Sequence, residues 1–308
     1  MANSFVLRPG DIVDIVAPGF RCTDESVELG IEFVRSLGLK PRVPAELFGE
    51  DLLCSNTDDR RFNDLRKALF ARDSRAVWCV RAGYGAIRFI ERLRKLKAPK
   101  AQKLFIGYSD ATTIHHVLNH LWRWPSVHGP LLDRLGGKSV REDELRELKA
   151  ALFGEQKAIV FSGLVPLNAA AKKKGRIRGK VFGGNLTVLQ TTLGTKLQRD
   201  HGEILFLEDI GERGYRVDRM LQHFEQAGAL RKLKAVVLGA FVGGNEVDGR
   251  NLTAPVLNRF AEGVKFPVFA GMDAGHGDYQ RLVCFNTPVE LKCGAVGELK
   301  IPWPGGRK

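Results

Sequence analysis

Short apolar runs alternate with longer amphipathic stretches along the first half of the chain. The apolar runs have the length of buried strands, and each is followed by a stretch with the apolar spacing of a helix. We expect strands over residues 11–16, 40–43, 76–80 and 103–106, and helices over residues 25–37, 58–71, 86–96 and 111–122. This repeated alternation predicts an α/β domain, in which a parallel sheet is covered by helices on both faces.

The regular alternation ends after a further expected helix over residues 142–153. Residues 154–175 lack clear periodicity, and because 308 residues exceed the usual size of one hydrophobic core, we expect the connection between two domains there. Beyond it we expect strands over residues 203–209 and 235–242, helices over residues 215–229 and 254–262, and a β-rich stretch from residue 266 onwards. The predicted organisation is an α/β domain of residues 1–153, a linker of residues 154–175, and a mixed, β-rich domain of residues 176–308.

The net charge of +13 could attract nucleic acid, because basic surfaces bind phosphates. The basic residues are mostly dispersed, however, and the densest cluster, over residues 172–180, has no interleaved aromatic side chains. We interpret this cluster as a solvated linker and expect no nucleic-acid partner. The sign of the charge also suits an anionic small substrate.

No apolar run approaches the roughly 20 residues that span a bilayer, so we expect no membrane association. The start of the chain has neither a basic region nor a long apolar core, and we expect no secretory signal. The five cysteines are odd in number, scattered and never spaced C-x-x-C, which favours reduced thiols over a disulfide framework or a structural zinc site. A cytoplasmic location follows from these expectations.

The strongest candidate chemistry lies at the end of the fourth expected strand, in the sequence LFIGYSDATTIH of residues 104–115. Gly107 and Ala111 lie two positions either side of Ser109, as a sharp strand-to-helix turn requires, since a larger side chain would collide there. Such a turn exposes the serine hydroxyl and directs the amide of Asp110 to the place where an oxyanion forms. The alternative is that Ser109 or Asp110 only caps the following helix.

A second glycine-containing turn, RAGYG over residues 81–85, follows the third expected strand. It lacks G-x-G-x-x-G and the lysine of a phosphate loop, so nucleotide binding is weakly supported. Its glycines would bring backbone amides close to a reacting oxygen, although a plain tight turn remains the alternative. Both turns belong at the carboxyl ends of parallel strands, where α/β sheets bind ligands.

A nucleophilic serine needs a general base, and that base needs an orienting group. Among the seven histidines, His276 lies between two glycines after an apolar strand and could reach across a cleft, although it could also be a histidine in a glycine turn. His116 and His120 have the i, i+4 spacing of a zinc pair but lack the accompanying glutamate, so we expect a partly exposed helix face and no metal site.

Glu208 is the expected orienting acid, because it ends a strongly apolar strand where an ionised carboxylate needs a partner. Asp209 and Glu212 are the alternatives, and all three could instead face water.

Five motifs together resemble the LD-carboxypeptidase family of serine peptidases, which includes the microcin-C-immunity peptidases. They are RAGYG at residues 81–85, GYSDAT at residues 107–112, GGNL at residues 183–186, LED at residues 207–209 and GHG at residues 275–277. The resemblance implies that Ser109 is the nucleophile, Glu208 the orienting acid and His276 the general base. It also implies that the amides of Asp110 and of Ala82 or Gly83 form the oxyanion hole.

We also expect Tyr84 and Asn185, which lie within these motifs, to contact the substrate. One departure is visible, since the family usually has two glycines after the arginine and this chain has Ala82 as the first. Its methyl group is tolerated if φ is negative there, but would cost about 1 kcal/mol or more in the left-handed region.

The family's fold implies a flavodoxin-like amino-terminal domain that carries the serine and a β-rich carboxy-terminal domain that carries the acid and the base, with the site between them. The resemblance further implies a cytoplasmic peptidase, without metal or cofactor, that removes the terminal D-alanine from a murein tetrapeptide. We expect a homodimer, which the sequence itself does not specify. The alternatives are cleavage of an aminoacyl-nucleotide amide and, from another class, nucleic-acid binding on a degenerate hydrolase scaffold.

Overall fold

A computed structural model describes residues 5–198 and 203–305 of the chain. It divides into two compact units, and each is described by itself. The first unit holds the chain up to Ala158 together with Arg281–Cys284 and the stretch from Trp303 onwards, and the second holds Ile159–Gln280 and Phe285–Pro302. No described helix is long and apolar enough to cross a membrane.

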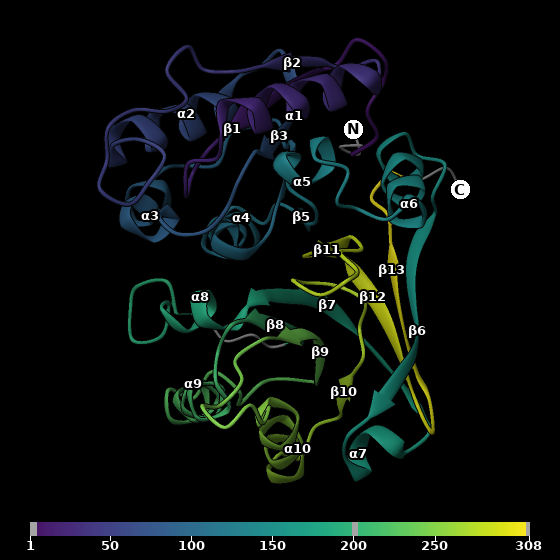
Figure 1. Cartoon of the computed structure of the whole chain (residues 1–308). Coiled ribbons are helices and arrows are strands. Elements are labelled where there is room, and N and C mark those ends of the chain that lie inside the picture. The colour runs from purple at the N-terminus through teal and green to yellow at the C-terminus, as the bar shows by residue number, and fades with distance from the viewer. Residues whose placement is uncertain (1–4, 199–202, 306–308) are drawn as a thin grey trace. The chain divides into compact units, whose positions relative to one another are not determined.

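The first unit is built on a parallel sheet, as expected (Figure 1). Its strands are β1 (Ile12–Val16), β2 (Lys40–Arg42), β3 (Ser74–Cys79), β4 (Leu104–Gly107) and β5 (Ser126–His128), and β11 (Val283–Phe285) extends the sheet beyond β5. The spatial order β2-β1-β3-β4-β5 is the flavodoxin-like order, in which the chain reverses direction across the sheet between β1 and β3. The predicted fold class is therefore confirmed for this unit.

Six helices are described in the first unit, and all except the short one over residues 132–136 begin and end close to the predicted positions. They are α1 (Asp24–Ser36), α2 (Asp58–Phe70), α3 (Ala86–Arg94), α4 (Thr112–His120), α5 (Leu132–Gly136) and α6 (Glu142–Leu152), and a 3₁₀ turn, η1 (Ser109–Ala111), precedes α4. Thr57, one of the two expected caps of α2, accepts a hydrogen bond from the amide of Arg60. Helix α4 is buried along almost its whole length, because it packs against both α3 and β5.

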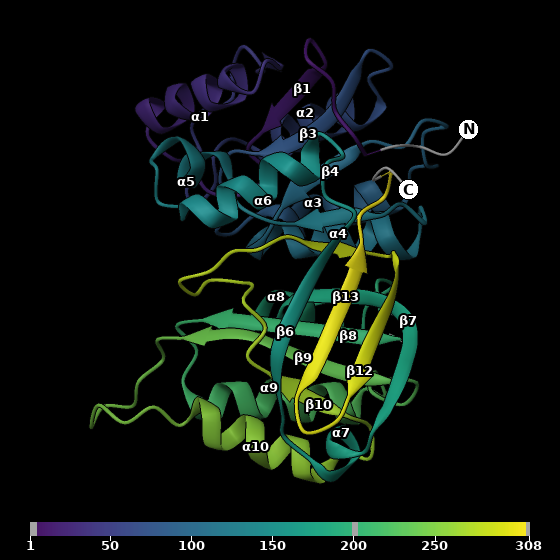
Figure 2. The same cartoon turned by 90° about the vertical axis from the view of Figure 1, so that its right-hand side faces the viewer.

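The second unit contains a closed barrel of mixed strands (Figure 2). The strand order is β10 (Val268–Ala270), β6 (Ala158–Pro166), β13 (Gly297–Pro302), β12 (Pro288–Cys293), β7 (Gly175–Asn185), β8 (Ile204–Ile210) and β9 (Ala235–Val242). Four consecutive strands, β7, β8, β9 and β10, are parallel to one another. In contrast, β12 is antiparallel to β7 and to β13. The expected mixed, β-rich character is confirmed, and its closure into a barrel was not predicted.

Three helices cover one side of the parallel strands of this barrel, namely α8 (Leu186–Gln190), α9 (Gly214–Gln226) and α10 (Thr253–Gly263). Their buried apolar residues, among them Leu189, Phe224 and Leu257, form one core with Leu205 and Val236 from the strands. This core packs against β8, the strand that carries the predicted acid. The segment expected as a linker, 154–175, contains all of β6 and the short helix α7 (Ala169–Lys172), and the basic side chains of residues 172–174 at the end of that helix are exposed.

Candidate active site

The turn at Ser109 has the strained backbone of a nucleophile elbow. Ser109 has a φ of 60°, whereas Tyr108 before it is extended at −149°. A Cβ added to Gly107 would lie 2.9 Å from the Cβ of Ala111 and 3.0 Å from the Sγ of Cys79, so the small residues predicted here are needed for the close approach. A residue other than glycine in this left-handed region is uncommon and marks a position worth a functional explanation.

Asp110 fixes this elbow to the turn at residues 81–85. Its buried Oδ2 accepts a hydrogen bond from the amide of Ala86 at 2.9 Å, and the Gly85 amide also donates to the carboxylate. These amides begin helix α3, where a negative charge is favoured, but burial nevertheless raises the pKa of Asp110 to about 6. Helix α4 has no side-chain cap, so the carboxylate of Asp110 caps α3 rather than its own following helix.

The turn at residues 81–85 accommodates the departure at Ala82. Ala82 is not among the residues with positive φ, whereas Gly83 has a φ of 94° and Gly85 a φ of 142°. The carbonyl of Ala82 accepts a hydrogen bond from the amide of Phe20 at 2.7 Å, and a Cβ on Gly83 would lie 2.3 Å from the Phe20 ring. The methyl group of Ala82 is therefore compatible with this backbone, and the oxyanion role of either amide stays a prediction.

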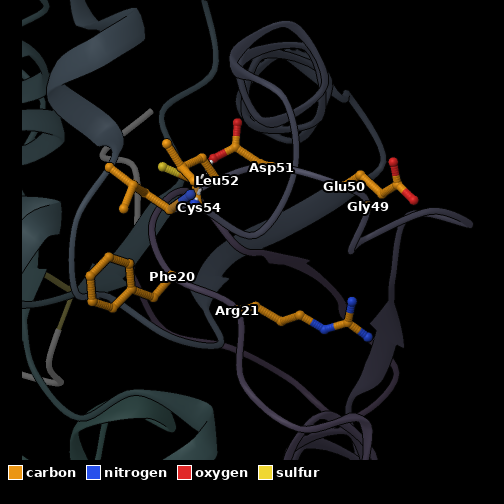
Figure 3. Close-up of a pocket in the computed structure, with 8 residues that line it drawn as sticks. Phe20, Arg21, Gly49, Glu50, Asp51, Leu52 and Cys54 are labelled. Atoms are coloured by element: carbon orange, nitrogen blue, oxygen red, sulfur yellow. Dashed lines mark hydrogen bonds between the residues drawn. The ribbon is translucent and has the colours of Figure 1, made fainter.

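An open pocket of about 910 Å³ lies beyond the carboxyl ends of β1 and β2 in the same unit. It is lined by Phe20, Arg21 and residues 49–54, and Figure 3 shows Phe20 and Arg21 on one side of it, opposite Leu52 and Glu50. The ring of Tyr84 lies 6.5 Å from that of Phe20 in an edge-to-face arrangement and is partly exposed. This pocket is at the edge of the sheet where open α/β folds bind ligands.

In the second unit, His276 is paired with Glu208. Nδ1 of His276 lies 2.6 Å from Oε2 of Glu208, and the backbone amide of His276 donates to the same oxygen at 3.2 Å. The Glu208 side chain is fully buried and that of His276 is 10% exposed. A carboxylate in this position fixes the ring orientation and favours a proton on Nδ1, which makes the other ring nitrogen the potential base.

An irregularity in β9 makes room for this pair. The register of β8 against β9 shifts between Leu207 and Asp209, on either side of Glu208. The turn that carries His276 packs beside the shifted strand, where the amide of Ala240 donates to the carbonyl of Ala274 at 3.0 Å. Bulges of this kind commonly redirect a side chain next to a functional site.

Gly275→Ala is expected to separate the pair, because a Cβ there would lie 2.7 Å from the Cβ and 2.8 Å from Oε2 of Glu208. Gly275 also has a φ of 108°, so we expect a loss of stability of about 1–3 kcal/mol. Gly271→Ala is the matched control, since its φ of 83° is also left-handed but the nearest atom to the added Cβ is 4.0 Å away. Urea unfolding should show a loss in both variants, whereas kcat should fall more than about 10-fold only for Gly275→Ala. Equal kcat values would contradict this role.

The two alternative acids have other partners. Asp209 accepts hydrogen bonds from the side-chain amide of Asn185 at 3.0 Å and from the backbone and hydroxyl of Thr187 at 2.9 Å, and burial raises its pKa. Glu212 lies 3.5 Å from Arg216 one turn along the chain. Of the three carboxylates considered, Glu208 is thus the one that the structure pairs with His276.

Asn185 serves as the N-cap of α8, because its side-chain oxygen accepts a hydrogen bond from the amide of Val188 at 3.0 Å. The side chain is 4% exposed, and its amide binds Asp209. These contacts give Asn185 a structural role, and its contact with substrate stays a prediction, as does that of Tyr84.

The expectation of a partly exposed histidine face on α4 is wrong for His116, which is 3% exposed. The reason is that α4 is enclosed by neighbouring elements, which the local pattern does not specify. His115 is fully buried and binds the hydroxyl of Ser126 and the carbonyl of Gly107, and burial lowers its pKa to about 3. Within the described residues no three metal-ligating side chains come together, and His201 lies outside those residues.

A serine at a left-handed strand-to-helix turn and an imidazole held by a buried carboxylate are the groups that characterise serine hydrolases. Comparisons with known proteins agree with this class. Residues 13–129 match the family model of the LD-carboxypeptidase N-terminal domain, and residues 178–291 match that of the C-terminal domain. The chain therefore belongs to the LD-carboxypeptidase family, and it is a hydrolase of the serine carboxypeptidase type.

Individual relatives support the same assignment. A putative carboxypeptidase of Rickettsia conorii is 38% identical over 82% of this chain and 80% of its own, and a probable murein peptide carboxypeptidase of Bacillus subtilis is 30% identical over 76% and 73%. The crystal structure of muramoyltetrapeptide carboxypeptidase from Oxalobacter formigenes superimposes with a TM-score of 0.81 at 26% identity, covering 94% of this chain and 98% of that one.

Proposed function

We propose that this chain removes the terminal D-alanine from murein tetrapeptides during peptidoglycan recycling in the bacterial cytoplasm. Ser109, His276 and Glu208 act together as a catalytic triad in this proposal. The buried contact between Glu208 and His276 is the observation that carries the catalytic part, because it supplies an oriented base. The choice of substrate is supported by the murein peptides named for the relatives from Bacillus subtilis and Oxalobacter formigenes.

In the proposed reaction, the Ser109 hydroxyl oxygen attacks the carbonyl carbon before D-alanine while Nε2 of His276 takes its proton. The tetrahedral intermediate then breaks its carbon–nitrogen bond, and His276 passes the proton to the amine of departing D-alanine. Water, activated by the same imidazole, hydrolyses the remaining serine ester and restores the enzyme. Glu208 stays ionised and stabilises the imidazolium that forms twice in this cycle.

The negative charge of each tetrahedral intermediate needs hydrogen-bond donors at its oxygen. We assign this role to the amide of Asp110 and to that of Ala82 or Gly83. Two contacts support the assignment, since the carboxylate of Asp110 binds the start of α3 and the carbonyl of Ala82 is tied to Phe20, so both turns are held rigidly. Rigid donors stabilise developing charge without reorganising during the reaction.

The proposal is tested by incubating the protein with murein tripeptide, tetrapeptide and pentapeptide and measuring the products by mass. We expect the tetrapeptide alone to lose one D-alanine, because only it presents the bond between an L centre and a terminal D residue. Cleavage of an aminoacyl-nucleotide amide with an inert tetrapeptide would instead favour the immunity-type alternative. Tight duplex binding near physiological salt without any hydrolysis would favour the nucleic-acid alternative. The homodimer stays a prediction.

A further inference from the structure

A carboxypeptidase must recognise the free carboxylate that marks the end of its substrate. That carboxylate lies one residue beyond the bond that is cut, and removing it from water is unfavourable unless a cation or several N–H donors replace the solvent. The proposed triad and oxyanion amides provide no permanently charged cation for this purpose. A basic side chain in the same unit as Ser109 and close to its strand would meet this requirement.

Arg81 follows the strand next to that of Ser109, at the equivalent position. Trp78 of β3 pairs with Ile106 of β4 in parallel, and Arg81 and Ser109 each follow their paired residue by three positions. Both residues thus leave the same edge of the sheet on neighbouring strands, which lie about 5 Å apart. The hydrogen bond between Asp110 and Ala86 then keeps the two turns together beyond the strands.

The Arg81 guanidinium is oriented and retains donors for a ligand. Nη1 donates to Oδ2 of Asp133 at 2.8 Å, and the side chain is 47% exposed. Within the described residues, no other hydrogen bond from this guanidinium is found. Since arginine has five N–H donors in a planar fork, enough remain to bind a carboxylate in the bidentate manner.

Asp133, the partner of Arg81, is itself held in place by the backbone. It lies in the first turn of α5, its side chain is 8% exposed, and its backbone amide donates to the carbonyl of Val80 at 3.0 Å. Its second oxygen, Oδ1, is buried without a hydrogen-bond partner among the described residues. A carboxylate so deeply buried needs a charged partner, and Arg81 is the cation that it binds.

Three other arginines near this edge of the sheet are directed to other elements. Arg61 is 1% exposed and binds Asp58 and backbone carbonyls, and Nε of Arg88 binds both oxygens of the same Asp58. Arg21 lies over the ring of Phe48, with its carbon Cζ 4.9 Å from the ring centre. Of these four, Arg81 is the one that directly follows the strand paired with that of Ser109.

We infer that Arg81 binds the terminal carboxylate of the peptide and that Asp133 is the positioning residue that directs Arg81 toward it. This inference rests on the proposed function and extends it, because it assigns the recognition of the chain end to a residue outside the triad. It implies that the enzyme discriminates between a terminal carboxylate and a terminal amide through one side chain.

The test compares murein tetrapeptide with the same peptide carrying a C-terminal amide, for wild type and for Arg81→Met. Wild type should prefer the acid by about 100-fold or more in kcat/KM, since truncating one partner of a charged pair has effects of this size. In Arg81→Met, kcat/KM for the peptide with a free carboxylate should fall to near that for the peptide amide. The kcat/KM for the peptide amide should change little. Arg81→Lys should restore part of the preference, because it keeps the charge without the fork.

Arg92→Met is the matched control, since Arg92 is 41% exposed and also pairs with an aspartate, Asp59, at 2.6 Å on the same unit. It should keep the wild-type preference. Asp133→Asn should raise KM for the acid with a smaller change in kcat and leave the amide unaffected, which a purely structural role would not do. If wild type cleaves the free acid and Arg81→Met still prefers the acid to the amide, the role of Arg81 is overturned and the proposed function stands. If wild type cleaves neither peptide, the proposed function is overturned as well.

Discussion

Ser109→Ala is expected to lower kcat for murein tetrapeptide by about 10⁴-fold or more, because the variant has no nucleophile and retains only the binding and oxyanion contributions. The elbow should remain folded, since the close contact there is between Gly107 and Ala111 and is not changed by removing one oxygen from Ser109. Steady-state kinetics with the tetrapeptide measure the loss, and urea unfolding measures the stability.

Ser36→Ala provides the control for Ser109→Ala. Its hydroxyl only donates to the carbonyl of Phe33 on an exposed part of the chain, so kcat should be unchanged. Residual activity of more than a few per cent in Ser109→Ala would show that another group attacks the peptide.

Glu208→Gln is expected to have the second large effect. The substitution keeps the shape of the side chain but removes the charge that stabilises the imidazolium, and its amide can present an N–H where Nδ1–H of His276 needs an acceptor. In a comparable triad such an amide lowers turnover by about 10⁴-fold. We expect a large loss in kcat with a modest change in KM, because the acid is not assigned a contact with the substrate.

Glu212→Gln is the matched control for this change, since it makes the same substitution in a carboxylate that pairs with Arg216 four residues further along the chain. It should leave kcat near the wild-type value. If Glu208→Gln were nearly as active as wild type and Asp209→Asn were inactive, Asp209 would be the acid and the Glu208–His276 contact would have no catalytic role.

The α/β unit could be predicted from the sequence because its elements are specified locally. Buried parallel strands such as β3 are continuous apolar runs, and the helices after them carry apolar residues at helical spacing. The sequence did not predict β5 and α5 of this unit, nor β6 of the barrel. β5 and α5 are too short to show a period, and β6 alternates between buried and exposed positions in a stretch interpreted as a linker.

The barrel could not be predicted, because its closure depends on pairing between residues far apart in the sequence. Val289 of β12 pairs with Gly179 of β7, and Phe269 of β10 pairs with Pro166 of β6. No local pattern specifies such partners, whereas the apolar character of β8 was sufficient to predict that strand and to place Glu208 on it, although the strand continues beyond Glu208 to Ile210.

Parts of the candidate site were visible in the sequence for physical reasons. Gly107 and Ala111 indicated the elbow because close backbone approach excludes larger residues, and the glycines beside His276 indicated a turn that could approach Glu208. The roles of Asp110 as a cap of α3 and of Asp133 as a partner of Arg81 depend on contacts between separate segments, and the sequence offered no signal for them.

The central claim is that Ser109, His276 and Glu208 act as one catalytic unit, and the kcat of the double variant Ser109→Ala with Glu208→Gln tests it most directly. Groups that act through one nucleophile are strongly non-additive, so removing Glu208 after Ser109 should have little further effect. We predict that the double variant retains the residual rate of Ser109→Ala, about 10⁴-fold below wild type. Losses that multiplied toward about 10⁸-fold would mean that Glu208 acts independently of Ser109, and would contradict the account.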